Sequence, residues 1–176
     1  CDWYLELVKP RMKDAARAPL ARQVLAHALD QTLRLLQPFV PFVTEELWAR
    51  LNELAPRRGI TAELPTTAGL LVQARWPSTS AGFRDEEQER RIALTQEVVA
   101  ALREVRARYQ VAPSARVPVV VRASGDAARL LVGCEALLAG TAGASELRID
   151  AAFVKPKDAA TAVVRDIEAY VLGVVD

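Results

Sequence analysis

The chain has 176 residues, 51% of them hydrophobic, which is enough to bury one good core or two small ones. Its 23 Lys and Arg residues against 22 Asp and Glu residues leave a net charge of +1, so nucleic-acid binding cannot be argued from bulk charge. No stretch approaches the roughly 20 uncharged apolar residues that span a bilayer, so a membrane protein is not expected.

Cysteine usage and the first residues bear on where the protein works. Cys1 and Cys134 have neither metal-ligand spacing nor the pattern of a disulfide framework, which favours a reducing, cytoplasmic setting. The chain opens inside an amphipathic run, without an initiator Met or a secretory pattern, and we expect it to be a piece of a longer protein.

The first half of the chain has a helical pattern. Apolar residues at three-and-four spacing predict four helices, over residues 1–14, 19–36, 41–54 and about 84–110. A long irregular stretch begins at Ala55, and residues 70–76 are its one ordered-looking piece.

The fourth helix is the longest, and its charges follow the helix dipole. Acidic residues 85–87 lie in its first turn and basic residues in its last. Helical geometry places Arg106 at the edge of the apolar face and Arg103 further towards solvent. The buried face is predicted on Ile92, Val99, Leu102, Val105 and Tyr109.

After residue 113 the periodicity changes to that of short strands. Residues 117–122 are predicted as a strand, and Pro118 indicates either a sheet edge or a strand start. Further elements are predicted as a helix over 126–139 ended by Gly140 and as strands over 146–150, 161–166 and 168–172. The fold class is therefore mainly α: a helical bundle over residues 1–112, followed by a small α+β unit over residues 113–176.

The most informative stretch is the elbow at residues 35–48, LLQPFVPFVTEELW. Two prolines three residues apart break the helix, and Pro41 suits the first turn of the next one. The stretch resembles the P-F-x-P-F-x-T-E-E-L-W signature of the helical domain that follows the catalytic core in class I aminoacyl-tRNA synthetases.

Four other segments, in family order, narrow this resemblance to valyl-tRNA synthetases: residues 1–9, 76–77, 101–113 and 172–176. Isoleucyl and leucyl enzymes share the elbow but fit the first and third of these segments less well. The resemblance implies that the bundle binds the anticodon stem-loop of tRNA. It also implies that earlier helices of the bundle and a C-terminal coiled coil lie outside residues 1–176.

The chain lacks the residue patterns of catalysis. It has neither the His-Ile-Gly-His-like nor the Lys-Met-Ser-Lys-Ser-like motif of a class I active site, and no glycine-rich phosphate loop. The lone His27 lies in mid-helix and is interpreted as a helix-face residue. We therefore expect no catalytic, cofactor-binding or metal-binding residue here. ATP is expected to bind the catalytic domain of the parent, an ATP-dependent valine–tRNA ligase.

Anticodon-loop bases are unstacked, so proteins read them by stacking and by contacts to base edges, while Arg and Lys hold the phosphates. By chemistry and position near the family motifs, the tRNA-binding candidates are Lys9, Arg11, Arg75, Trp76, Arg103 and Arg106. For any single arginine the competing interpretation is a solvated surface residue. Trp3, Phe39 and Trp48 are predicted in the core.

These patterns support three hypotheses about function. The first is a non-catalytic, monomeric tRNA-binding region of a valyl-tRNA synthetase, which positions valine tRNA and contacts the rest of the synthetase chain. The second is a helical protein-interaction module, favoured by the high apolar content and near-neutral charge. The third is the equivalent region of an isoleucyl-type synthetase. For residues 113–176 we expect a packing role that braces the long helix.

Overall fold

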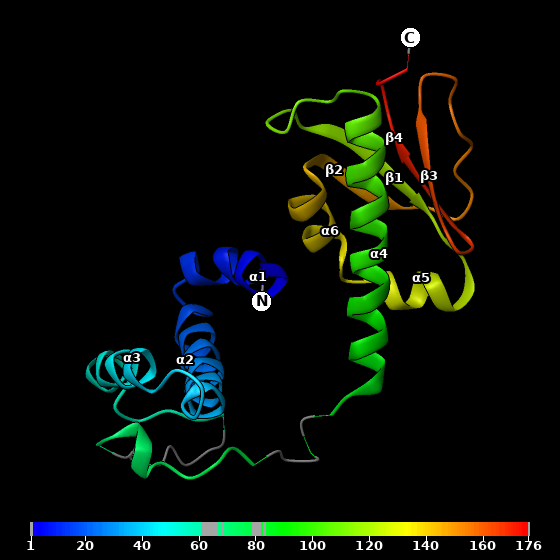
Figure 1. Ribbon diagram of the computed structural model, residues 1–176. Coiled ribbons are helices and arrows are strands. Elements are labelled where there is room, and N and C mark those ends of the chain that lie inside the picture. Colours follow the sequence, from blue (N-terminus) through cyan, green and yellow to red (C-terminus); the bar gives the residue numbers. More distant parts are fainter. Residues whose placement is uncertain (1, 61–66, 68, 79–81, 83, 176) are drawn as a thin grey trace. The chain divides into compact units, whose positions relative to one another are not determined.

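The computed structural model describes residues 2–60, 67, 69–78, 82 and 84–175. It consists of two units, Cys1–Phe83 and Arg84–Asp176. The sequence pattern had predicted this boundary between residues 112 and 113 instead. The long helix α4 belongs to the second unit because it packs on that unit's strands and short helices (Figure 1). Within the described residues, no helix has both the length and the apolar character needed to cross a membrane.

The first unit contains the three helices predicted for it. They are α1 (Asp2–Lys13), α2 (Ala18–Leu36) and α3 (Pro41–Leu54), and a short 3-10 helix, η1 (Leu71–Gln73), follows. Both Pro19 and Pro41 lie in the first turn of their helices, where a missing N–H costs nothing. Helix α2 packs on α1 and α3, and α3 packs on η1. The core of this unit is formed by Leu33, Trp48, Leu51 and Leu71.

The break between α2 and α3 carries apolar side chains that this unit does not cover. Trp48 is fully buried, as predicted, and Trp3 is half-buried. The prediction for Phe39 is wrong, because this side chain is 79% exposed. It lies in the irregular break, where no helix face directs it onto a neighbour. We call the exposed set the apolar elbow: Leu35, Leu36, Phe39, Val40, Phe42 and Val43.

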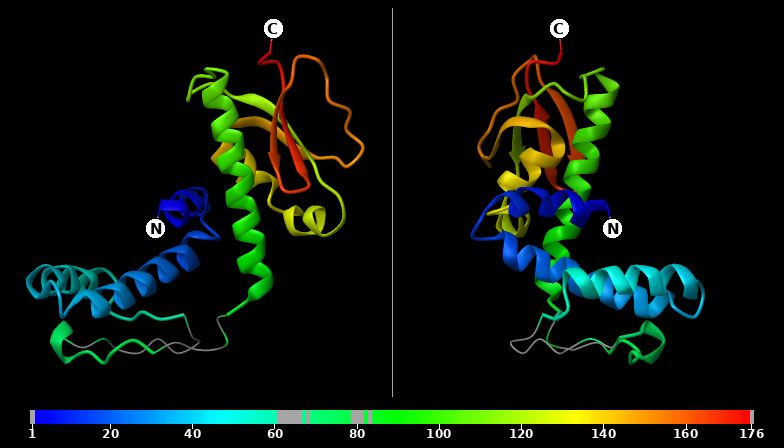
Figure 2. Two further views of the ribbon diagram at one scale, coloured as in Figure 1. Left: turned by 45° about the vertical axis from the view of Figure 1, so that its right-hand side comes forward. Right: turned by 90° about the vertical axis from the view of Figure 1, so that its left-hand side faces the viewer.

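The second unit is a small mixed sheet packed with three helices. Its elements are α4 (Glu86–Arg108), β1 (Val117–Arg122), α5 (Gly125–Leu131), α6 (Glu135–Ala142), β2 (Ala144–Ile149), β3 (Ala160–Val164) and β4 (Ile167–Val171). The strand order is β2-β1-β4-β3, with β1 parallel to β2 and antiparallel to β4. Figure 2 shows α4 (green) alongside the sheet, where it packs on β3 and β4 and also on α5 and α6.

Strand β1 is central, so Pro118 marks a strand start and not a sheet edge. The pairing of β1 with β2 is irregular between Val117 and Val119, which accommodates the proline at that point. The carbonyl of Pro118 still accepts a hydrogen bond of 3.0 Å from the Leu172 N–H.

The single helix predicted over 126–139 is two helices, which corrects the prediction. Gly133 has a φ of +80° and lies in the break between α5 and α6. Gly140 lies inside α6, and the glycine that ends α6 is Gly143, with a φ of +70°.

The buried face of α4 is confirmed at Val99, Leu102 and Val105. Ile92 and Tyr109 are 37% and 42% exposed, so the prediction is wrong at both positions. Tyr109 caps the helix and Ile92 lies in its first half, so both lie outside the best-covered segment, which includes Leu94 and Val98.

A side chain at Gly143 should be costly. Its positive φ disfavours any Cβ, and a Cβ there would stand 3.3 Å from Nη2 of Arg106. We expect Gly143→Ala to lower the free energy of unfolding by about 1–2 kcal/mol, measured by chemical denaturation.

Gly140→Ala is the matched control. Gly140 lies inside α6, the helix that Gly143 ends, with nothing within 4 Å of a built Cβ, so Gly140→Ala should leave stability unchanged or raise it by up to about 1 kcal/mol. Equal effects of the two substitutions would contradict a specific role for Gly143.

Candidate nucleic-acid interface

The residues that follow the elbow prolines fix the loop that packs on α3. The Thr44 hydroxyl is buried and donates to two carbonyl oxygens of the preceding turn, each at 3.0 Å. The Glu45 carboxylate accepts hydrogen bonds from the backbone N–H groups of Leu71 at 2.9 Å and Val72 at 2.8 Å. A carboxylate on the first free N–H groups of η1 anchors that segment to α3.

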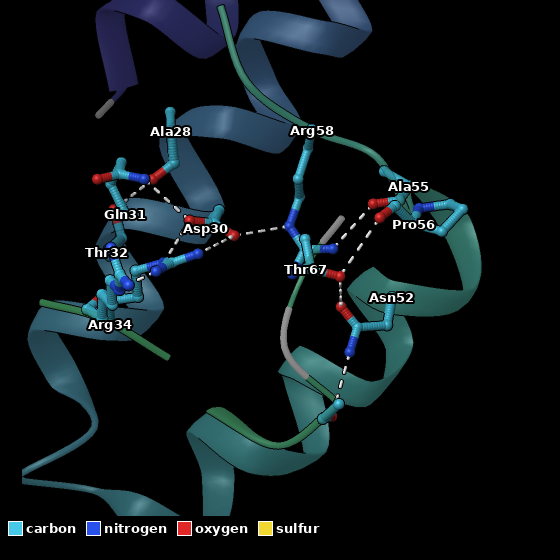
Figure 3. A network of polar contacts seen from close by, with 12 residues as sticks. Ala28, Asp30, Gln31, Thr32, Arg34, Asn52, Ala55, Pro56, Arg58 and Thr67 are labelled. Carbon is cyan, nitrogen blue, oxygen red and sulfur yellow. Dashed lines mark hydrogen bonds and ion pairs between the residues drawn. The ribbon is translucent and has the colours of Figure 1, made fainter. Parts of the chain in front are cut away.

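A buried ion-pair network lies between α2 and the loop after α3 (Figure 3). The carboxylate of Asp30, 3% exposed, accepts hydrogen bonds from Nε of Arg34 at 2.6 Å and from Nε of Arg58 at 2.8 Å. Gln31 donates a third hydrogen bond to it, at 2.9 Å. The two guanidinium groups also lie over the Trp48 ring, at 5.1 Å for Arg34 and 4.3 Å for Arg58.

This network joins three segments that are distant in sequence. Nη1 of Arg58 donates to the Ala55 carbonyl at 2.8 Å, and Nη1 of Arg34 donates to the Arg75 carbonyl at 2.8 Å. Nη2 of Arg58 is buried and has no partner among the described residues. Asp30 was not singled out from the sequence, although an acidic residue within the apolar pattern of 19–36 was a usable signal.

An arginine-lined depression opens beside this network. It has a volume of about 510 Å³ and lies between the first half of α2 and residues 54–58. We call it the arginine groove and define it by Arg22, Arg57 and Arg58. None of its described lining residues is acidic. Arg22 and Arg57 are exposed, and neither forms an ion pair with another described residue. Both guanidinium groups are therefore available to an anion.

The structure places the first-unit candidates in two separate pairs. On α1, Lys9 is paired with Glu6 at 2.6 Å, while Arg11 lines a cavity of about 320 Å³ at the start of α2. Arg75 and Trp76 follow η1, and the Trp76 ring is 63% exposed. The Arg75 carbonyl accepts a hydrogen bond from Arg34, near the end of α2. The two pairs are therefore separated by most of the length of α2, about 20 Å along its axis.

The candidates in the second unit, Arg103 and Arg106, donate hydrogen bonds to the end of α6. Arg103 donates from Nε and Nη2 to the Thr141 carbonyl, at 3.1 and 2.8 Å. Arg106, 6% exposed, donates to the Gly143 carbonyl at 3.1 Å and to two loop carbonyls at 3.2 and 2.8 Å. Burial lowers the pKa of Arg106 from its ordinary value, and the charge of Arg116 lowers it further. Both arginines thus satisfy carbonyls that a helix end leaves without partners, which the sequence did not predict.

The comparisons with known proteins agree with this architecture. A family model described as the anticodon-binding domain of tRNA ligase matches residues 1–121. The chain belongs to this family. It is 39% identical to a valine--tRNA ligase of Rhodopirellula baltica over 82% of the chain and 14% of the relative.

Two further valine--tRNA ligases match this anticodon-binding chain over almost its whole length. The one from Symbiobacterium thermophilum is 36% identical over 97% of the chain and 20% of the relative. The one from Thermotoga maritima is 37% identical over 97% of the chain and 18% of the relative. The chain therefore spans about a fifth or less of the length of these relatives. In the part of the chain that the structure describes, no three His, Cys, Asp or Glu side chains gather as metal ligands.

Neutralising Asp30 should destabilise the first unit. Asp30→Asn keeps the shape of the side chain but leaves the buried Arg58 without a counter-charge, so we expect a loss of about 3–5 kcal/mol in chemical denaturation. Glu46→Gln is the control, because its exposed pair with Arg50 should contribute less than about 1 kcal/mol. Similar losses in the two variants would contradict a structural role for the network.

Proposed function

We propose that this anticodon-binding domain is a non-catalytic part of a valine–tRNA ligase that holds the anticodon stem-loop of valine tRNA. Support comes from the family match and from the valine--tRNA ligases that share 36–39% identity with the chain. The observation that carries the proposal is the arginine groove, where Arg22 and Arg57, which form no ion pair with another described residue, lie beside a buried network.

The groove has the chemistry that a single-stranded RNA loop requires. Phosphates are held by Arg side chains, whose planar fork can donate two parallel hydrogen bonds to one phosphate. Arg22 lies on a helix, and Arg57 precedes a residue that Asp30 holds in place, so both are mounted on ordered backbone. Positioning of this kind lowers the entropy cost of binding.

The exposed Trp76 supplies a second element of RNA recognition. An unstacked base can stack on an exposed indole, and such stacking contributes about 1–3 kcal/mol per base in single-strand binding. Arg75 stands next to it in sequence and can contact the flanking phosphate. Lys9 and Arg11 on α1 extend the proposed surface along α2.

In the longer ligase this binding would orient tRNA for a reaction that occurs elsewhere. Binding energy from a remote part of the substrate can be used to position the reacting end. Activation of valine with ATP is assigned to the parent's catalytic domain. We further propose that the protein acts as a monomer in the cytoplasm.

Docking on another protein surface is the second candidate function, and the apolar elbow favours it. Six large apolar side chains are exposed around one turn of the chain, with Phe42 at 90%. Several large apolar side chains exposed on one short segment are typical of an interaction site. The two functions are compatible, since the elbow and the arginine groove are formed by different residues.

The double variant Arg22→Gln/Arg57→Gln should weaken binding to a valine-tRNA anticodon hairpin and reduce its salt dependence. For a single-stranded loop, the slope of log K against log salt should decrease by about 0.7 for each phosphate that the variant no longer holds. Arg50→Gln, on the exposed side of α3 and already paired with acidic neighbours, should change neither quantity.

Binding would be measured by fluorescence anisotropy at several salt concentrations, with a second hairpin whose anticodon bases are replaced. Weaker binding to the replaced hairpin means that bases are read by residues 1–176. An unchanged slope in the double variant would contradict the arginine groove as the RNA site. Binding to neither hairpin would contradict the proposed function and leave docking through the apolar elbow as the alternative.

A further inference from the structure

The second unit contains a larger cavity that no sequence motif indicated. It has a volume of about 700 Å³ and lies where the end of α4, the loop after it and the end of α6 meet. We call it the α6 pocket and define it by Arg103, Arg106 and Arg116. Figure 1 shows α4 and α6 side by side, and the two helices pack on each other.

The lining of this pocket is strongly unbalanced in charge. Among the described residues that line it, three are arginines and none is acidic. The C-terminal ends of α4 and α6 contribute negative dipole charge, about half an elementary charge each. The charges of Arg106 and Arg116 alone outweigh the two helix ends by about one positive charge. An anion in the pocket would offset this excess.

Helix capping explains only part of the arrangement. Arg103 and Arg106 are fixed by short hydrogen bonds to the end of α6 and the loop after α4. Arg116 is exposed, and its hydrogen bond to the Ala144 carbonyl, at 3.4 Å, is long. It forms no ion pair with any residue that the structure describes. Its guanidinium group can therefore turn towards a ligand at little cost.

Arg106 provides a second, fixed source of charge. It is buried without a carboxylate partner in the described part of the unit, so only backbone carbonyls compensate its charge. Burial lowers its pKa, and the neighbouring charge of Arg116 lowers it further, as expected of two like charges held close together. A bound anion would reverse that effect and stabilise both groups. Ser114, which also lines the pocket, has a neutral hydroxyl that can donate a hydrogen bond to an anion.

We propose that the α6 pocket binds a phosphate group, and that in the ligase this group is a backbone phosphate of tRNA. The cavity is larger than a phosphate alone requires, so it leaves room for the sugar on either side. The tRNA part of the proposal rests on the function proposed above. The phosphate part rests on the pocket alone.

The test uses the whole 176-residue chain labelled with ¹⁵N and titrated with inorganic phosphate at constant ionic strength in chloride. We expect the amide signals of Ser114, Gly140 and Gly143, which line the pocket, to shift and saturate. Arg116→Gln should weaken phosphate binding about tenfold or more, the loss expected for one charged hydrogen bond. Arg116→Lys should recover part of the affinity, since the charge returns without the planar fork.

Arg90→Gln is the matched control, because Arg90 is an exposed arginine near the other end of α4. It should leave the phosphate titration unchanged. Absence of saturable shifts, or equal effects of Arg116→Gln and Arg90→Gln, would overturn the site.

A second titration with the anticodon hairpin and with full-length valine tRNA separates the two possible sources of phosphate. Shifts of the pocket amides with full-length tRNA support the proposal, whether or not the hairpin alone produces them. Shifts with inorganic phosphate and with neither RNA would overturn the tRNA part and leave a site for a free phosphate ion.

The Arg22→Gln/Arg57→Gln variant keeps this test distinct from that of the proposed function. If the arginine groove does not bind RNA, that variant binds RNA normally while the phosphate shifts at the α6 pocket persist.

Discussion

The first unit depends on one buried ion pair, between Asp30 on α2 and Arg58 in the loop after α3. Removing both charges from water is costly, and their attraction offsets that cost only with good geometry and additional hydrogen bonds. Here Asp30 accepts from three side chains, and Arg58 also lies over the Trp48 ring. The pair holds the loop after α3 at one place on α2, so the exposed Arg57 and the groove beside it are positioned by a core interaction.

The second unit holds its loops with the same kind of side chain but with different acceptors. Arg103 and Arg106 donate hydrogen bonds to backbone carbonyls at the end of α6, and none of the described residues that line the pocket there is acidic. A carboxylate neutralises a guanidinium group, whereas carbonyl dipoles leave most of its charge in place. Both units therefore use a buried arginine for packing: Arg58 is held by a carboxylate, whereas Arg106 is held by backbone carbonyls alone among the described residues.

The sequence pattern predicted most of the helices and strands but few of the residues of the candidate site. Apolar periodicity and the elbow prolines were sufficient for α1, α2 and α3. They failed at Phe39, since burial of a residue in a break depends on what packs over it. Arg106 and Gly143 are 37 residues apart, so their contact follows only from the packing of α4 on α6. Arg22 and Arg57 have the local pattern of any solvated arginine, and only the groove, a property of tertiary structure, distinguishes them.

The boundary between Phe83 and Arg84 shows where the chain can be cut without dividing either unit. The family model ends at residue 121, inside β1, which is a central strand. A cut there would separate β1 from both of its neighbouring strands, β2 and β4. It would also expose the apolar face of α4. A division at residues 83 and 84 leaves the sheet and both cores whole. A cut at this junction, unlike one where the family match ends, would therefore separate the two units without dividing the sheet or the long helix.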